Sequence, residues 1–171
     1  MDEASDEELS LASIDHPRLV GLHRYWDAKR GGRDMPSRDD LDPVEMAPYL
    51  GHVFLIDVES NPRRFRFRLI GTEIVLSYGR ELTGKYTDAV TPPSYREMIE
   101  RHYAQAVDER RPLVHRMTFR EDRGKRHDLV RLTLPLSDDG ASVNMLLLCS
   151  AFGPDLRRFR ERQRSVFVSR P

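Results

Sequence analysis

The chain has 171 residues, of which 39% are hydrophobic, and this length and composition suit one globular domain with short flanking segments. Its 28 basic and 28 acidic residues give a formal net charge of zero, which argues against a nucleic-acid-binding domain, because such domains are usually strongly basic. Cys149 is the single cysteine and no apolar run approaches the roughly 20 residues of a membrane span, so we expect no disulfide, no membrane insertion and a cytoplasmic location.

The two ends of the chain carry opposite charges. Residues 1–10 contain five acidic and no basic side chains, whereas residues 155–171 contain six arginines against two acidic side chains. We interpret both ends as solvated tails, an acidic one at 1–14 and a basic one at 156–171, on either side of a domain at 15–155. The alternative is that the tails contact each other, a neighbouring subunit or a charged partner.

Residues 17–30 are predicted to form an amphipathic helix. Asp15 followed by Pro17 is typical of a helix start, and Gly31 with Gly32 is typical of a helix end. The helix has an apolar stripe that consists of Leu19, Leu22, Tyr25 and Trp26. This stripe can cover a sheet of its own chain, or pack on a second subunit around a two-fold axis.

Five later segments show the patterns of β-strands. Residues 53–58 are apolar on both alternating faces and residues 143–152 are almost wholly apolar, so we expect both inside a sheet. Residues 64–69 alternate arginines with apolar side chains, which is typical of an edge strand with one wet face. Residues 113–120 and 130–136 also alternate, and they are expected on the other side of the sheet.

Helical segments separate these strands. Short helical turns are expected after Asp42 and over residues 71–78, and a capping box at Ser94 and Glu97 opens a longer helix that ends near Asp108. The order of elements predicts an α+β fold. Its five-stranded antiparallel sheet has the strand order 2-1-5-4-3, with helices on one face and the amphipathic N-terminal helix in addition.

Three blocks of sequence resemble the bacterial PAS domain subfamily known as PAS_5. The first runs from Trp26 through Arg30-Gly31-Gly32 to MPSRDDLDP at 35–43, the second is RFRLIGTEI at 66–74, and the third is GRELTGK at 79–85. The resemblance covers roughly residues 15–155. It implies a non-enzymatic sensory or protein-interaction module, in which the helices and the inner face of the sheet enclose a pocket for a small ligand.

The chain departs from the cofactor-binding members of the PAS superfamily. Light-sensing PAS domains that bind flavin need a reactive cysteine on the helical side, whereas Cys149 falls on the last predicted strand, so no flavin adduct is expected. PAS domains that bind haem often use a histidine of the long helix, and His102 has that position, but we prefer to interpret it as a hydrogen-bonded core residue. The ligand stays unassigned.

We predict a ligand pocket on the helical side of the sheet. Its candidate lining residues are Phe67, Tyr78, Met98, His102, Tyr103 and Met117. A cavity lined by apolar side chains with a few polar tips is typical of small-molecule sites, although a filled core would show the same sequence, and both alternatives stay open.

The sequence indicates no catalytic or metal site. No nucleophile–base or acid–base set is visible, and the histidines show no metal-ligand spacing. Arg64, Arg66 and Arg68 are either a phosphate-binding strip or, as we prefer, the charged protection of an edge strand.

Two functional hypotheses follow. The first is a ligand-gated sensory module of bacterial signal transduction that acts through protein–protein contacts. The second is a ligandless interaction domain that serves as an adaptor for a regulatory partner. In either case we expect a homodimer built on the N-terminal helix, with no nucleic acid and no membrane as partner.

Overall fold

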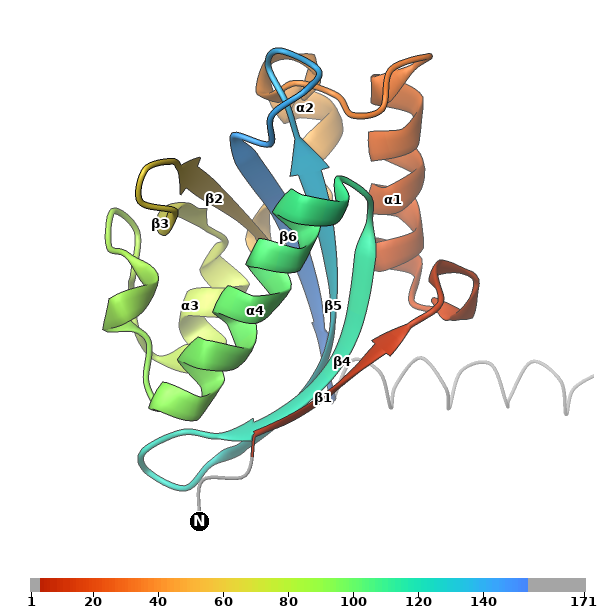
Figure 1. The fold of residues 1–171 in the computed structure, drawn as a ribbon. Coiled ribbons are helices and arrows are strands. Elements are labelled where there is room, and N and C mark those ends of the chain that lie inside the picture. The colour runs from red at the N-terminus through yellow and green to blue at the C-terminus, as the bar shows by residue number, and fades with distance from the viewer. Residues whose placement is uncertain (1–3, 154–171) are drawn as a thin grey trace, which may run out of the picture.

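A computed structural model describes residues 4–153, and its centre is a six-stranded antiparallel sheet (Figure 1). The strands are β1 (Ser5–Leu9), β2 (Val53–Glu59), β3 (Arg64–Ile70), β4 (Leu113–Arg120), β5 (Arg126–Leu136) and β6 (Met145–Phe152). The α-helices are α1 (Pro17–Arg30), α2 (Pro43–Met46), α3 (Thr72–Tyr78) and α4 (Pro93–Glu109). Short 3₁₀ segments lie at Leu11–Ser13, Arg38–Asp40, Leu50–His52 and Thr87–Ala89.

The sheet has the order β1-β4-β5-β6-β2-β3, which confirms the predicted order of the five later strands. The two strands that are apolar on both faces, β2 and β6, are neighbours, with Ile56 opposite Leu146. Strands β5 and β6 lie in the middle of the sheet, where helices cover both of its faces, and almost none of their side chains is exposed.

The sixth strand corrects the prediction of a solvated acidic tail. Residues 5–9 pair with β4 at the edge of the sheet, where Asp6 lies opposite Met117 and Glu8 opposite His115. Acidic residues are poor strand formers and β1 shows no apolar alternation, so its sequence gives no local signal for a strand. Its acidic side chains pair with basic ones of α4 and β4, Asp6 with Arg101 and Glu7 with Arg116. The predicted basic tail at 156–171 lies outside the described residues.

Helix α1 packs against β5 and β6 on the face of the sheet opposite α4 (Figure 1). Leu19 and Leu22 are completely buried there, and the indole Nε1 of Trp26 donates a hydrogen bond to the Pro135 carbonyl at 2.9 Å. The predicted dimer surface on this stripe is therefore wrong for these three side chains, because the sheet of their own chain already covers them. Tyr25 is half-buried, and its hydroxyl accepts a hydrogen bond from the Asp42 amide at 2.9 Å.

Helices α3 and α4 lie on the other face of the sheet (Figure 1). The buried side of α4 carries the predicted stripe, which consists of Tyr95, Met98, Ile99, His102, Tyr103 and Ala106. Two helix starts differ from the prediction by one or two residues, since His16 caps α1 in place of Asp15, and Pro92 precedes α4 in place of Ser94. Among residues 4–153, no helix is long and apolar enough to cross a membrane.

Candidate functional site

A small cavity lies between α3, α4 and the inner face of the sheet. Its volume is about 50 Å³. The apolar part of the wall consists of Phe54, Phe67, Ile70, Ile74, Leu82, Val90 and Ile99. The polar part consists of Tyr78, Arg80, Thr91, Tyr95, Tyr103 and Arg131. This space holds a few water molecules and is well below the roughly 300 Å³ at which sites for drug-sized ligands begin.

The structure divides the six side chains that we predicted for the pocket. Phe67, Tyr78 and Tyr103 line the cavity. Met98 and Met117 are buried in the apolar core outside the cavity wall, and His102 is turned toward strand β1. A cavity does exist on the expected side of the sheet, but it is displaced from the middle of α4 toward α3.

Arg131 also lines the cavity, but it was not predicted there from the sequence. It lies on β5 and alternates there with leucines, as an exposed arginine of a half-buried strand would, yet the side chain is only 2% exposed. Its Nε donates to the Ser150 hydroxyl and its Nη2 to the Tyr95 hydroxyl, both at 3.1 Å. The guanidinium carbon lies 4.9 Å from the centre of the Phe54 ring. Within residues 4–153 no carboxylate pairs with this cation.

Three tyrosine hydroxyls share the cavity with Arg131. The hydroxyls of Tyr78 and Tyr95 are 2.7 Å apart and form one hydrogen bond. The hydroxyl of Tyr103 is buried and has no hydrogen-bond partner among the residues described. Burial raises the pKa of Tyr78 and of Tyr103 above the ordinary range, and the positive charge of Arg131 only partly opposes this effect. Both side chains therefore remain protonated hydrogen-bond donors.

The cavity opens toward a groove on the surface. This groove has a volume of about 510 Å³ and lies between the end of α3 and the β4–β5 turn. Tyr78, Arg80 and Thr91 line both spaces, and Arg80 Nη1 donates to the Thr91 hydroxyl at 2.7 Å. The cavity and the groove therefore adjoin at these three residues.

A second polar cluster joins α4 to strand β1. His102 Nε2 lies 2.7 Å from Asp6 Oδ2, and Arg101 donates to the other oxygen of the same carboxylate at 2.6 Å. The imidazole of His102 stacks on that of His115, with ring centres 3.7 Å apart. Burial and the neighbouring His115 lower the pKa of His102 to about 4, although Asp6 acts in the opposite direction. His102 is therefore neutral and donates its Nε2 proton to Asp6.

This cluster contains the donor types of a metal site, which the scattered histidines of the sequence did not indicate. Asp6, His102 and His115 offer ligand atoms that lie within 4.8 Å of one another. However, the two imidazole planes are inclined by only 8°. Nitrogen lone pairs lie in the ring planes, so two parallel rings do not direct them at one ion. The arrangement favours a hydrogen-bonded latch for β1, and the absence of a metal stays a prediction.

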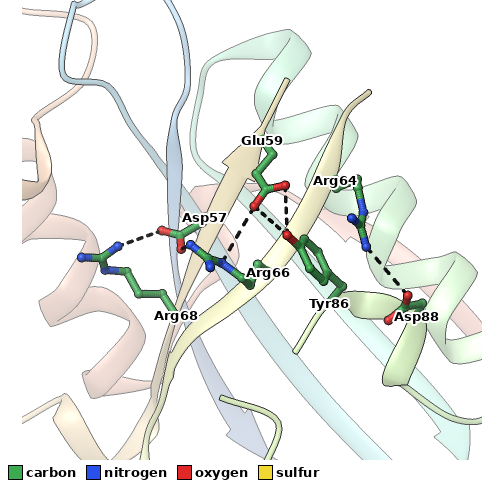
Figure 2. A network of polar contacts seen from close by, with 7 residues as sticks. All are labelled: Asp57, Glu59, Arg64, Arg66, Arg68, Tyr86 and Asp88. Atoms are coloured by element: carbon green, nitrogen blue, oxygen red, sulfur yellow. Dashed lines mark hydrogen bonds and ion pairs between the residues drawn. The ribbon is translucent and has the colours of Figure 1, made fainter. Parts of the chain in front are cut away.

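The arginines of β3 form a neutralised network at the other edge of the sheet (Figure 2). Arg66 and Arg68 both reach Asp57, at 3.0 and 3.4 Å, and Arg64 lies over the Tyr86 ring at 3.5 Å. The Tyr86 hydroxyl donates to Glu59 at 2.9 Å. Because acidic partners already occupy these cations, the network favours a charged edge strand over a phosphate-binding strip.

The two residues that bear on flavin and haem chemistry lie outside the cavity wall. Cys149 is buried in β6, where burial raises the pKa of its thiol to about 12, and His102 is engaged by Asp6. Neither side chain lines the helix-side cavity.

The sequence is similar to a known family over most of its length. The family model PAS_5, described as a PAS domain, matches residues 14–157. A solved structure titled "Structure of an RNA-binding Light-Oxygen-Voltage Receptor" is similar to 99% of this chain, at 11% identity and a TM-score of 0.48. The chain spans 43% of the length of that structure, and a likeness at this level carries no functional argument. No curated protein matches the sequence.

Proposed function

Because the chain belongs to the PAS_5 family of PAS domains, we propose that it is a sensory module which binds a small molecule in the helix-side cavity and signals through protein–protein contacts. PAS domains are generally sensory modules without enzymatic activity, and we propose no catalytic role for this one. A cytoplasmic location and a role in bacterial signal transduction belong to the same proposal.

The observation that carries the proposal is the polar content of the cavity. Among residues 4–153, the buried hydroxyl of Tyr103 has no hydrogen-bond partner and the buried cation of Arg131 has no counter-ion, in a wall that is otherwise largely apolar. Nearly all buried polar groups of native proteins are hydrogen-bonded, because an unsatisfied one costs about 1–3 kcal/mol. A bound polar molecule would satisfy both groups at once.

Helix α4 connects the cavity with the edge of the sheet. Tyr95, Ile99 and Tyr103 of α4 line the cavity, whereas Arg101 and His102 contact Asp6 of β1. A ligand shifts an equilibrium only by its differential affinity for the two states. We therefore propose that the occupied cavity favours one position of α4, and that strand β1 reports this position to a partner.

The homodimer stays part of the proposal, but its surface differs from the one first expected. The apolar stripe of α1 is not available for it. Large apolar side chains that remain exposed are Val44 at 82% and Leu76 at 76%, on α2 and α3. Sedimentation of the full chain at micromolar concentration tests the dimer, and a monomer there would remove it from the proposal.

A ligandless interaction domain is the second candidate. The observation that favours it is the cavity volume of about 50 Å³, which is small enough for the core to count as nearly filled. In this function the exposed β1 edge and its ion pairs would dock the regulatory partner directly.

Native mass spectrometry and thermal unfolding of the full chain separate the two candidates. We expect a co-purified small molecule, or a saturable rise in Tm with one compound of a metabolite panel. At 100 times Kd this compound should raise the free energy of unfolding by about 2.7 kcal/mol. Ile74→Phe places a larger side chain in the cavity wall and should abolish the rise. Leu50→Phe, at a partly exposed position outside that wall, is the control and should keep it. A full chain that neither carries nor responds to any compound would favour the ligandless domain.

A further inference from the structure

The polar atoms of the cavity are unbalanced between donors and acceptors. Among the residues that the structure describes, no aspartate or glutamate lines its wall. The guanidinium of Arg131 keeps its charge at all pH values that proteins tolerate, and of its five N–H groups the described contacts use two, one to Ser150 and one to Tyr95. The remaining N–H groups have no acceptor among residues 4–153.

The tyrosines add further donors. In the pair of Tyr78 and Tyr95, one hydroxyl hydrogen is used between the two oxygens, and the other is left without a described acceptor whichever residue donates. The hydroxyl of Tyr103 is likewise unpaired. The cavity therefore combines an uncompensated positive charge with at least two free hydroxyl donors.

A buried cation without a counter-ion is costly, because the protein interior stabilises charge much less than water does. A ring face such as that of Phe54 and neutral oxygens offset part of this cost. A carboxylate offsets more, since hydrogen bonds between two charged groups are roughly twice as strong as neutral ones. Such a group would accept from Arg131 and from the tyrosine hydroxyls together.

We propose that the cavity binds a small organic monocarboxylate, with its carboxylate on Arg131 and the tyrosine hydroxyls and its short apolar part against Phe54, Ile74 and Ile99. This inference rests on the proposed ligand-binding function and names the class of ligand. The volume of about 50 Å³ limits the ligand to a few heavy atoms unless the cavity widens toward the groove at Arg80. Arg131 is the one buried cation that the described part of the wall contains, and it matches one negative charge. The apolar wall favours a carbon chain over a hydrated inorganic anion.

Propionate is the probe, and propionamide is its neutral isostere. On the full chain we expect propionate to raise Tm in a saturable manner, and propionamide to bind at least about tenfold more weakly, because it cannot form the charge-assisted pair. Sodium nitrate at equal ionic strength should not reproduce the rise. Equal binding of propionamide would overturn the charge assignment while leaving the pocket in place, and an equal effect of nitrate would overturn the organic carboxylate.

The variants locate the site. Arg131→Met should abolish the response to propionate, whereas Arg126→Met should keep it, because Arg126 lies on the same strand but is exposed and pairs with Asp128. Without ligand, Arg131→Met should unfold at the same temperature as the wild type or higher, since it removes an uncompensated buried charge. A large fall in Tm with an unchanged affinity for propionate would assign Arg131 to structure alone.

Three further cases complete the test. If Arg131→Met does not fold, Tyr103→Phe replaces it, because this change removes only the unpaired hydroxyl; it should weaken propionate binding several-fold, and unchanged binding would overturn the proposed contact. If propionate does not stabilise the full chain but native mass spectrometry finds a neutral ligand, the proposed ligand-binding function is supported and the proposed carboxylate ligand is refuted. If neither experiment detects a ligand, both the ligand-binding function and the carboxylate ligand are refuted.

Discussion

Gly71 has a role that only its backbone surroundings explain. A Cβ atom at this position would lie 2.3 Å from the carbonyl oxygen of Gly51, and the Gly71 amide already donates to the Val53 carbonyl at 2.8 Å. The neighbouring backbone cannot give way without a shift of the β2–β3 hairpin. Gly71→Ala should therefore destabilise the protein by about 3 kcal/mol, the upper range for overpacking, as measured by urea unfolding. Gly32→Ala, which meets no atom within 4 Å, is the control and should have little effect.

His102 should make the stability depend on pH. Its pKa is about 4 in the folded chain, compared with an ordinary value of 6.5, so the unfolded chain binds more protons between these two values. The stabilising contribution of the neutral ring is complete above about pH 6.5 and is lost as the pH falls toward 4. From pH 7 to pH 5 we expect the free energy of unfolding to fall by about 2 kcal/mol through this residue.

The variant His102→Gln measures this contribution, because glutamine does not titrate. Its urea midpoint should fall less than that of the wild type between pH 7 and pH 5. His115 and His127 also have lowered pKa values because of burial, and they supply part of the remaining slope. Identical slopes for variant and wild type would show that His102 is not the titrating group.

The sequence predicted some residues of the cavity wall but not others. Phe67, Tyr78 and Tyr103 were found because apolar and aromatic side chains on the inward side of strands and helices converge on one face. Arg131 was not found, since an arginine that alternates with leucines has the same local pattern whether it faces water or a cavity. Its burial depends on Tyr95, 36 positions earlier in the chain, and on Ser150 on the next strand.

Among the elements, strand β1 contacts its neighbours largely through charged side chains. The Asp6 carboxylate is 24% exposed and accepts hydrogen bonds from Arg101 and His102, whereas Glu7 is 64% exposed and pairs with Arg116, at 3.2 Å. Asp6→Asn should destabilise the fold by about 1–2 kcal/mol, because it weakens two hydrogen bonds at a half-buried site. Glu7→Gln is the matched control on the same strand and should cost less than about 0.5 kcal/mol.

Amide hydrogen exchange measures the local stability of β1 in the same two variants. Asp6→Asn should raise the exchange of β1 and of the facing amides of β4, while Glu7→Gln should leave both close to the wild type. Equal exchange in the two variants would mean that the backbone ladder alone holds β1, and that the contacts to α4 do not.

The elements differ in how far the sequence could predict them. The patterns at 17–30, 53–58 and 64–69 match α1, β2 and β3 closely, since amphipathic periodicity and two-sided apolarity are local properties. Strand β1 has neither property. Its acidic side chains contact basic groups about 100 positions away, such as Arg101 and Arg111, and no short window of sequence contains both partners.

At the scale of the molecule, both faces of the central strands β5 and β6 are covered within one chain. Helix α1 closes the outer face and α3 and α4 close the inner face, so the apolar residues of β5 and β6 need no second subunit for burial. The dimer was expected because the outer face had to be covered, and this reason no longer applies. The sheet order and the family were predictable because they depend on the succession of elements, whereas the covering of a face depends on how one helix folds back.

The central claim is that a small ligand enters the helix-side cavity and that α4 transmits its presence to β1. A titration of the isotope-labelled full chain with propionate, followed by NMR, tests it directly. We predict saturable shifts of the Arg131 Nε–H and of the α4 amides near Tyr95 and Tyr103, with β1 amides such as that of Asp6 responding at the same propionate concentrations. Shifts that do not saturate, or that are confined to exposed arginines and absent from Arg131, would contradict it.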